Sequence, residues 1–175
     1  GDEALDESSA SGEGFLAELC RDWEAAAQEA ASEQTEVVRL RFGMVLSSDG
    51  GALERMLLPF KLGVGGPIGS GTQFWPWVSL ADVVGVVNFA IRSGSLAGAV
   101  NVVAPHETRC KEFTRTLGKV LHRPAFLPAP APAIKLALGE MAEALLLASA
   151  RVRPTTLLDA GYQFEHPTLE EARRT

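Results

Sequence analysis

The residues best suited to bind a small molecule are five glycines gathered near the middle of the chain. They are followed by an aromatic segment, residues 74–77, of sequence FWPW. Glycine is costly to order, so it is used where the backbone takes a positive φ or lies close to another group. The cluster predicts one wall of a small-molecule pocket, although a glycine-rich turn between two core elements would account for it equally well. The five positions are Gly63, Gly65, Gly66, Gly69 and Gly71.

Other reactive side chains do not combine into a known type of site. The histidines, His106, His122 and His166, lack the i, i+4 pairing of a metal-binding helix, which argues against a metal site. Ser70 lies between two glycines but outside the strand-to-helix turn of a hydrolase nucleophile. Cys20 and Cys110 lack CxxC spacing, so we expect reduced thiols rather than a disulfide.

Composition narrows the possible partners. The chain has 175 residues, is 46% hydrophobic and carries a net charge of -6. No run of Lys or Arg is available to neutralise phosphates, which disfavours a nucleic-acid or anionic-membrane surface. The apolar runs are far shorter than the roughly 20 residues that cross a bilayer. The sequence therefore predicts a soluble chain of one domain, or of one domain with a small appendage.

The elements that must position these residues alternate between helix and strand. Apolar residues at helical spacing predict a helix over 15–30, with Trp23 in the core. Strands are predicted over 35–47, 73–79 and 99–104, and the first of these requires partners for Arg39 and Arg41. Ser79 and Asp82 form a capping box for a helix through residue 91. This βαβα order predicts a parallel sheet.

Composition changes at Pro124. Four prolines between residues 124 and 132 predict an extended linker into helical segments over 133–150. We further predict Thr108 as the N-cap of the preceding helix, a short helix from Pro154 to Gly161 and a brief strand over 162–165. Thr168 and Glu171 would form a second capping box.

The predicted sheet is incomplete. Only three convincing strands are found, and no GxGxxG segment joins a strand to a helix as dinucleotide phosphates require. The first strand also follows a lone helix rather than another strand.

Several motifs together resemble one known family. In order they are WEAAA, LRFGMVLSSDGGAL, LPFKLGVGGPIGSGTQFWPWVSLADV, NVVAP, HRPAFLPAP, LGE and AGYQF. Their order is similar to that of the epimerase family, an atypical group of extended short-chain dehydrogenases/reductases also labelled nucleoside-diphosphate-sugar epimerases, NADP-dependent oxidoreductases or cell-division inhibitors. The resemblance covers nearly the whole chain, but only the latter half or so of a typical member.

The resemblance implies a fold and a domain division. Residues 1–121 would be the latter part of a Rossmann-like α/β domain with its substrate-side loop, and residues 122–175 a small, mostly helical domain of unknown function. The nucleotide-binding half would precede Gly1, making this chain a fragment. NADP or NAD would be bound mainly by that half.

The resemblance also implies site residues. Arg41, Gly43 and Val45 would lie near the nicotinamide end of the cofactor. The substrate side would include Gly69, Gly71, Gln73 and Trp77, facing an unknown small molecule that is nucleotide-sugar-like in some members. Where the family often has Trp-Ile-His, this chain has WVS at residues 77–79 and so lacks an imidazole.

The usual catalytic pair is missing. Short-chain dehydrogenases use Tyr-x-x-x-Lys on one helix, where i and i+4 share a face. Leu16 and Cys20 occupy the matching positions, and the single tyrosine, Tyr162, lies in the C-terminal appendage. The catalytic residues are therefore unknown, and Cys20 is either a reactive thiol or, the favoured alternative, a buried helical cysteine.

Two functions remain open. The chain is either the substrate-side part of an NAD(P)-dependent oxidoreductase or epimerase, or a non-catalytic scaffold within a larger complex, with a protein partner covering the open sheet edge. Bacterial cytoplasm and plastid stroma are both compatible with the family.

Overall fold

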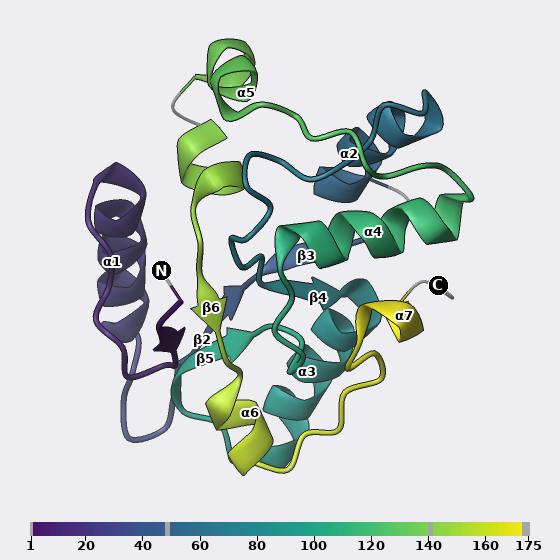
Figure 1. Cartoon of the computed structure of the whole chain (residues 1–175). Helices are drawn as coiled ribbons and strands as arrows, with labels where there is room; N and C mark the ends of the chain where they lie inside the picture. The colour runs from purple at the N-terminus through teal and green to yellow at the C-terminus, as the bar shows by residue number, and fades with distance from the viewer. Residues whose placement is uncertain (1, 48–49, 140–141, 173–175) are drawn as a thin grey trace.

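The computed structural model describes residues 2–47, 50–139 and 142–172 (Figure 1). Strands are short and alternate with helices along much of the chain. In order, the elements are β1 Ala4–Leu5, α1 Phe15–Gln28, β2 Val38–Phe42, β3 Met44–Leu46, α2 Gly51–Lys61, β4 Trp77–Ser79, α3 Leu80–Ser93, β5 Gly98–Val102, α4 Cys110–Leu121, α5 Ala131–Leu138, the π-helix η1 Ala142–Leu147, β6 Arg151–Val152, α6 Thr155–Asp159 and α7 Leu169–Ala172.

The strands form three parallel pairs, as the βα alternation predicts. β2 pairs with β5 over five residues, β3 pairs with β4, and β1 pairs with β6. The strand predicted over 35–47 is divided into β2 and β3 at Gly43, where the chain leaves β5 and joins β4. A Cβ atom on Gly43 would lie 2.8 Å from the carbonyl of Pro76, so a glycine is needed at this junction.

Two clusters of buried side chains fix the helices to these strands. Val100 and Val102 of β5 are fully buried with Val86 of α3 and Leu157 of α6. The β-branched residues suit a strand packed against helices. The second cluster lies around β3 and β4, where α2 and α4 contribute Phe60, Phe113 and Leu117 to a core that contains Trp75 and Trp77.

Helix α1 is bound differently from the other long helices. It forms where its apolar periodicity predicts, but no residue of α1 is buried in the described part of the chain. Phe15 is 75% exposed and Trp23 69% exposed, so placing Trp23 in the core was wrong. The helix is joined to β2 by an ion pair between Glu24 and Arg41.

The predicted N-cap of α3 is confirmed, and the predicted N-cap of α4 is wrong. At the start of α3, the Ser79 hydroxyl accepts the backbone N–H of Asp82 at 3.0 Å, and Gly94 ends the helix at φ 56°. The N-cap of α4 is Arg109 rather than Thr108. Thr108 is instead held by Trp77, whose indole N–H donates to its hydroxyl.

The C-terminal segment folds back over the glycine loop. The linker pairs with the loop at Ile68 and Ala129, and Figure 1 shows α5 at the top of the molecule, above η1 and β6. The helical segments predicted over 133–150 are α5, which begins two residues earlier at Ala131, and η1, with residues 140–141 outside the described part. The strand predicted over 162–165 is wrong, because these residues form a loop, and β1 and β6 were not predicted.

Within the described residues, no helix combines the length and apolar character needed to span a bilayer.

Candidate functional site

The glycine loop forms one wall of a hollow of about 410 Å³. This volume falls within the range of small-molecule sites. The glycine-loop hollow, as we call it, is bordered by the loop, α5, residues 147–149 and Asp2. Six of its nine lining residues have polar or charged side chains, and the full lining consists of Asp2, Gly69, Ser70, Thr72, Gln73, Ala131, Lys135, Leu147 and Ser149.

Glycines allow the loop and the proline-rich linker to lie in contact. A Cβ atom on Gly66 would be 2.0 Å from the carbonyl oxygen of Leu127, so no side chain fits there. Gly69 has φ 59° and donates its N–H to the Ala129 carbonyl at 2.9 Å. Gly69 therefore belongs to a tight turn that also borders the hollow, whereas the other four glycines of the cluster do not line it.

Gln73 is the central polar residue of this wall. Its side-chain amide donates to the carbonyls of Ile68 and Leu146, each at 3.0 Å. Trp75 donates its indole N–H to the same Leu146 carbonyl at 3.1 Å. Gln73 thus joins the loop to η1, and it is 7% exposed.

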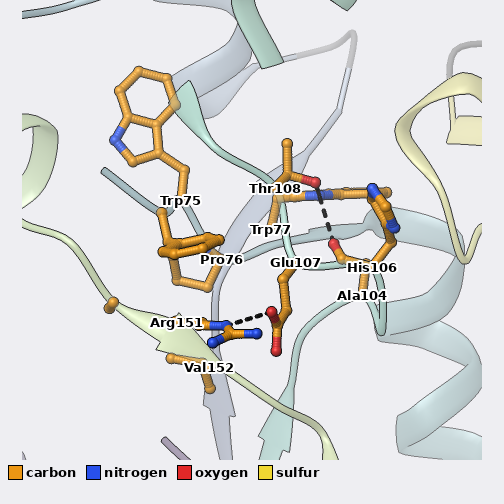
Figure 2. Close-up of a pocket in the computed structure, with 11 residues that line it drawn as sticks. Trp75, Pro76, Trp77, Ala104, His106, Glu107, Thr108, Arg151 and Val152 are labelled. Carbon is orange, nitrogen blue, oxygen red and sulfur yellow. Dashed lines mark hydrogen bonds and ion pairs between the residues drawn. The ribbon is translucent and has the colours of Figure 1, made fainter. Parts of the chain in front are cut away.

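The structure places Trp77 and Gly71 away from the hollow. Trp77 is 1% exposed and its indole N–H donates to the Thr108 hydroxyl at 3.0 Å, so its assignment to the substrate side is corrected to a core position. Gly71, with φ 68°, is buried against Pro67. Trp77 borders the small cavity of Figure 2, whose volume of about 10 Å³ excludes anything larger than water.

Charged side chains surround the aromatic segment. The guanidinium carbon of Arg109 lies 4.1 Å from the ring centre of Phe74. Glu107 bridges Arg151 and Arg153, an ion pair visible in Figure 2 for Arg151. Burial alone would raise the pKa of Glu107, but hydrogen bonds from Arg153 and Arg151 hold that pKa below its ordinary value. Glu107 is therefore a bridging anion and not a proton donor near neutral pH.

The three residues assigned to the cofactor side lie along β2 and β3. Arg41 donates two hydrogen bonds to Glu24, at 2.6 and 2.7 Å. These hydrogen bonds are the main reason why the pKa of the Glu24 carboxyl lies below its ordinary value. Gly43 forms the junction between the strands, and Val45 is half-buried in β3. The Nε atom of Arg39, on the same face as Arg41, is buried and has no hydrogen-bond partner in the described chain.

A buried polar network that we did not predict joins α3 to the C-terminal segment. The Asp82 carboxylate accepts the Ser79 hydroxyl at 2.7 Å and the backbone N–H groups of Glu165 and His166 at 2.7 and 3.1 Å. The hydroxyl of Tyr162 donates to the Asp82 carbonyl at 3.3 Å. Burial, reinforced by the Asp82 charge, raises the pKa of Tyr162 to about 12, which makes a proton-transfer role near neutral pH unfavourable.

Neither cysteine has a metal-binding environment. Cys110 is buried and receives the backbone N–H of Ile68 at 3.4 Å, and burial raises its pKa to about 11. Cys20 is exposed on α1, which corrects the favoured alternative of a buried thiol. Among the described residues no three His, Cys, Asp or Glu side chains are grouped to hold a metal ion.

A second, larger depression lies outside this region. It is an apolar groove of about 760 Å³ between α2, α3, α4 and α7. Its walls are dominated by residues such as Leu57, Val84 and Leu121, with few polar groups to orient a substrate. The glycine-loop hollow is therefore the better candidate site for a polar ligand.

Two solved structures match the fold of this chain over nearly its whole length. The crystal structure of human epimerase family protein SDR39U1 (isoform 2) with NADPH matches with a TM-score of 0.93 and 39% identity, over 99% of this chain and 59% of that one. A nucleoside-diphosphate sugar epimerase from Corynebacterium glutamicum matches with a TM-score of 0.79 and 32% identity, over 98% of this chain and 33% of that one.

Sequence comparison gives the same relationship. Epimerase family protein MT2273 of Mycobacterium tuberculosis is 43% identical over 171 residues, which are 98% of this chain and 57% of that protein. Residues 129–174 match a family model described as "Domain of unknown function (DUF1731)". The chain thus spans 57% of the Mycobacterium tuberculosis relative, 59% of the human structure and 33% of the Corynebacterium structure.

The parallel βα architecture gives the chain a fold that matches Rossmann-like proteins of the NAD(P)-binding class. Within that class, the chain belongs to the epimerase family of extended short-chain dehydrogenases/reductases.

Proposed function

We propose that these residues are the substrate-side part of an NAD(P)-dependent oxidoreductase or epimerase, and that the glycine-loop hollow receives its small-molecule substrate. The observation that carries the proposal is the polar hollow itself, in a chain whose fold matches that of a relative crystallised with NADPH. The substrate is a small polar molecule, consistent with the hydroxyl, amide and charged groups of the lining.

The chain alone does not fit the phosphates of a dinucleotide. Those phosphates require clustered backbone N–H groups at a helix N-terminus after a glycine-rich turn, and the sequence contains no GxGxxG motif. We infer that the remaining length shared by the relatives supplies the phosphate site. Arg41, Gly43 and Val45 remain our assignments for the nicotinamide side, with Arg41 acting through its ion pair to Glu24.

The exposed face of α1 also supports the inference that a further part of the protein packs against this chain. Phe15 and Trp23 are both largely exposed on one helix of the described chain. Burying such side chains is worth about 1.5–3 kcal/mol each, so a further part of the protein would gain stability by covering them. The helix also carries Leu16 and Cys20 at the positions of the family's Tyr-x-x-x-Lys pair.

The second candidate function is a non-catalytic, dehydrogenase-like scaffold in a larger complex. Two observations favour it. The catalytic pair is absent from this chain, and its single tyrosine, Tyr162, is occupied in the network around Asp82. In that case α1 and the open strand edges would be covered by a different protein.

Cofactor titration separates the two functions. The protein that contains these residues is isolated from its source, its intact mass is determined, and NADPH and NADH are titrated by their fluorescence. Saturable binding of either dinucleotide by a protein longer than this chain supports the reductase or epimerase. A protein of 18.6 kDa that binds neither supports the scaffold.

A further inference from the structure

The apolar groove between α2, α3, α4 and α7 has the size of a small-molecule site. Its volume of about 760 Å³ lies within the roughly 300–1,000 Å³ that is usual for such sites. Figure 1 shows α2, α4 and α7 on the opposite side of the molecule from α1. Two of the lining residues, Leu80 and Val84 of α3, are 47% and 54% exposed. A ligand that covered them would remove apolar surface from water, which is favourable.

One hydroxyl group lines this groove without a hydrogen-bond partner. Thr116 of α4 is 7% exposed and lies between the apolar lining residues Leu117 and Val120. In the part of the chain that the structure describes, its hydroxyl makes no hydrogen bond. Thr114 of the same helix, by contrast, donates to the Lys111 carbonyl at 3.3 Å. A buried hydroxyl without a partner is unfavourable, so the position suits a ligand that supplies one.

The charge of the groove is negative. Glu165 is the one charged side chain among the described residues that line it. Its backbone N–H donates to Asp82 at 2.7 Å, which holds the residue in place. Its exposed carboxylate forms no ion pair within residues 2–47, 50–139 and 142–172. A ligand carboxylate would therefore be repelled from this groove and a ligand ammonium attracted to it.

We propose that this groove is a second binding site and that its ligand is a lipophilic amine. The aliphatic part of the ligand lies against the leucine and valine side chains of the four helices. The Thr116 hydroxyl accepts an N–H of its ammonium group, and Glu165 attracts the positive charge through space without having to touch it.

A helix of a partner protein is the main alternative occupant. Three turns of helix are about 16 Å long and 10–12 Å wide with side chains, so they occupy more than about 1,200 Å³. This volume is larger than that of the groove, and the observations favour the smaller ligand.

The test compares three probes that share one aliphatic chain and differ in their polar group. Octylamine, 1-octanol and octanoate are titrated by calorimetry, at pH 7 and low salt, into the full-length protein that contains these residues. The amine is protonated and the acid is ionised at this pH. We expect octylamine to bind most tightly and octanoate most weakly. The proposal is overturned if octylamine does not bind, or if either of the other probes binds as tightly.

Two variants examine the polar residues separately. Thr116→Val keeps the shape of the side chain and should weaken octylamine binding about three- to tenfold. Its midpoint of urea unfolding should be unchanged or raised, because the fold does not pair that hydroxyl. A lowered midpoint with unchanged binding would make the hydroxyl a structural group and overturn its assignment. Glu165→Gln should weaken octylamine binding about two- to fivefold and leave 1-octanol binding unchanged.

A third variant closes the groove, and a matched change on the same helix serves as its control. Val84→Trp places an indole in the groove from a half-exposed position, so it should weaken octylamine binding about tenfold or more. Val87→Trp makes the same change at an exposed residue that does not line the groove and should leave binding unchanged. Equal binding by the two variants would place the ligand elsewhere and overturn the site.

The inference does not depend on the proposed function. The groove and the glycine-loop hollow share no lining residue among those that the structure describes. Octylamine binding without dinucleotide binding would keep the groove as a site while removing the oxidoreductase assignment, and the reverse result would overturn the groove alone.

Discussion

The phenol oxygen of Tyr162 occupies the space that a side chain on Gly85 would need, since a Cβ atom there would lie 2.2 Å away. Gly85 lies within α3, where glycine costs about 1 kcal/mol relative to alanine. Tyr162 contacts Phe89 and Phe164 edge-on at ring distances of 5.4 and 4.9 Å. The helix therefore accepts an unfavourable residue so that the C-terminal segment can dock against it.

Replacing Gly85 by alanine tests this contact. We expect Gly85→Ala to lower the free energy of unfolding by about 1–3 kcal/mol, because overpacking outweighs the gain in helix propensity. The measurement is urea unfolding followed by circular dichroism. Asn88→Ala, an exposed change on the same helix, serves as the control and shifts stability by less than about 0.5 kcal/mol.

The double variant Gly85→Ala/Tyr162→Phe shows whether the hydroxyl is responsible. Without that oxygen the nearest ring atom, Cζ, would lie 3.4 Å from the new Cβ, an ordinary contact. The two changes should therefore cost less together than the sum of their separate effects, by about 1 kcal/mol. Simple additivity would show that the clash is relieved in some other way.

Asp82 provides the second prediction. Its buried carboxylate accepts hydrogen bonds from Ser79, Glu165 and His166. We expect Asp82→Asn to lower the free energy of unfolding by about 2–3 kcal/mol, because the amide nitrogen cannot accept and leaves buried N–H groups unpaired. Asp159→Asn, at an exposed position, is the matched control. Equal free energies of unfolding for the two variants would show that the hydrogen bonds to Asp82 do not stabilise the fold.

The Glu24–Arg41 pair leads to a prediction about acid sensitivity. Its partial exposure limits its contribution to at most about 1 kcal/mol. Hydrogen bonding from Arg41 lowers the pKa of Glu24 from its reference value of 4.5, so the stabilisation is present above that value and is lost as pH falls through the folded-state pKa.

Urea unfolding between pH 7 and pH 3 checks this behaviour. Glu24→Gln should be slightly less stable than the natural protein at pH 7, and the difference should vanish at the acid end. The exposed Glu33→Gln provides the comparison. An acid-independent difference would mean that Glu24 acts through packing instead of charge.

Local sequence signals predicted the elements whose causes are local. The cap formed by Ser79 and Asp82 and the helical spacing of α1 both appear where expected. Each depends on residues within a few positions of one another. The parallel pairing of β2 with β5 also followed, because βα alternation constrains topology.

Features made by distant residues could not be predicted in this way. Asp2 meets Arg109 across 107 positions, and Gln73 meets the Leu146 carbonyl across 73. The spacing of apolar residues along the sequence does not indicate contacts between residues so far apart. Trp23 was misplaced for the complementary reason, since helical spacing identifies an apolar face but not what covers it. Trp77 was assigned to the substrate side from the family resemblance, which does not specify how deeply one side chain of that segment is buried.

The last prediction concerns alkaline pH and follows from two buried acids. Burial raises the pKa of the Cys110 thiol from 9.0 to about 11, and mainly burial raises that of Tyr162 from 10.0 to about 12. Both groups keep their protons longer in the folded state. The free energy of unfolding is therefore highest below pH 9 and decreases as pH rises through the folded-state pKa values. For each group, the unfolding equilibrium constant increases by up to tenfold per pH unit in this range.

Cys110→Ser isolates the lower part of this alkaline loss. Serine does not ionise in this range, so the variant should lose less stability between pH 9 and pH 11 than the natural protein, whatever its stability at neutral pH. Cys20→Ser, at an exposed thiol, should keep the full loss. A thiol-reactive dye at pH 8 should label Cys20 before Cys110. If Cys110→Ser and Cys20→Ser follow the same alkaline curve, the buried thiol is not linked to folding, and the alkaline loss belongs to Tyr162 or to other groups.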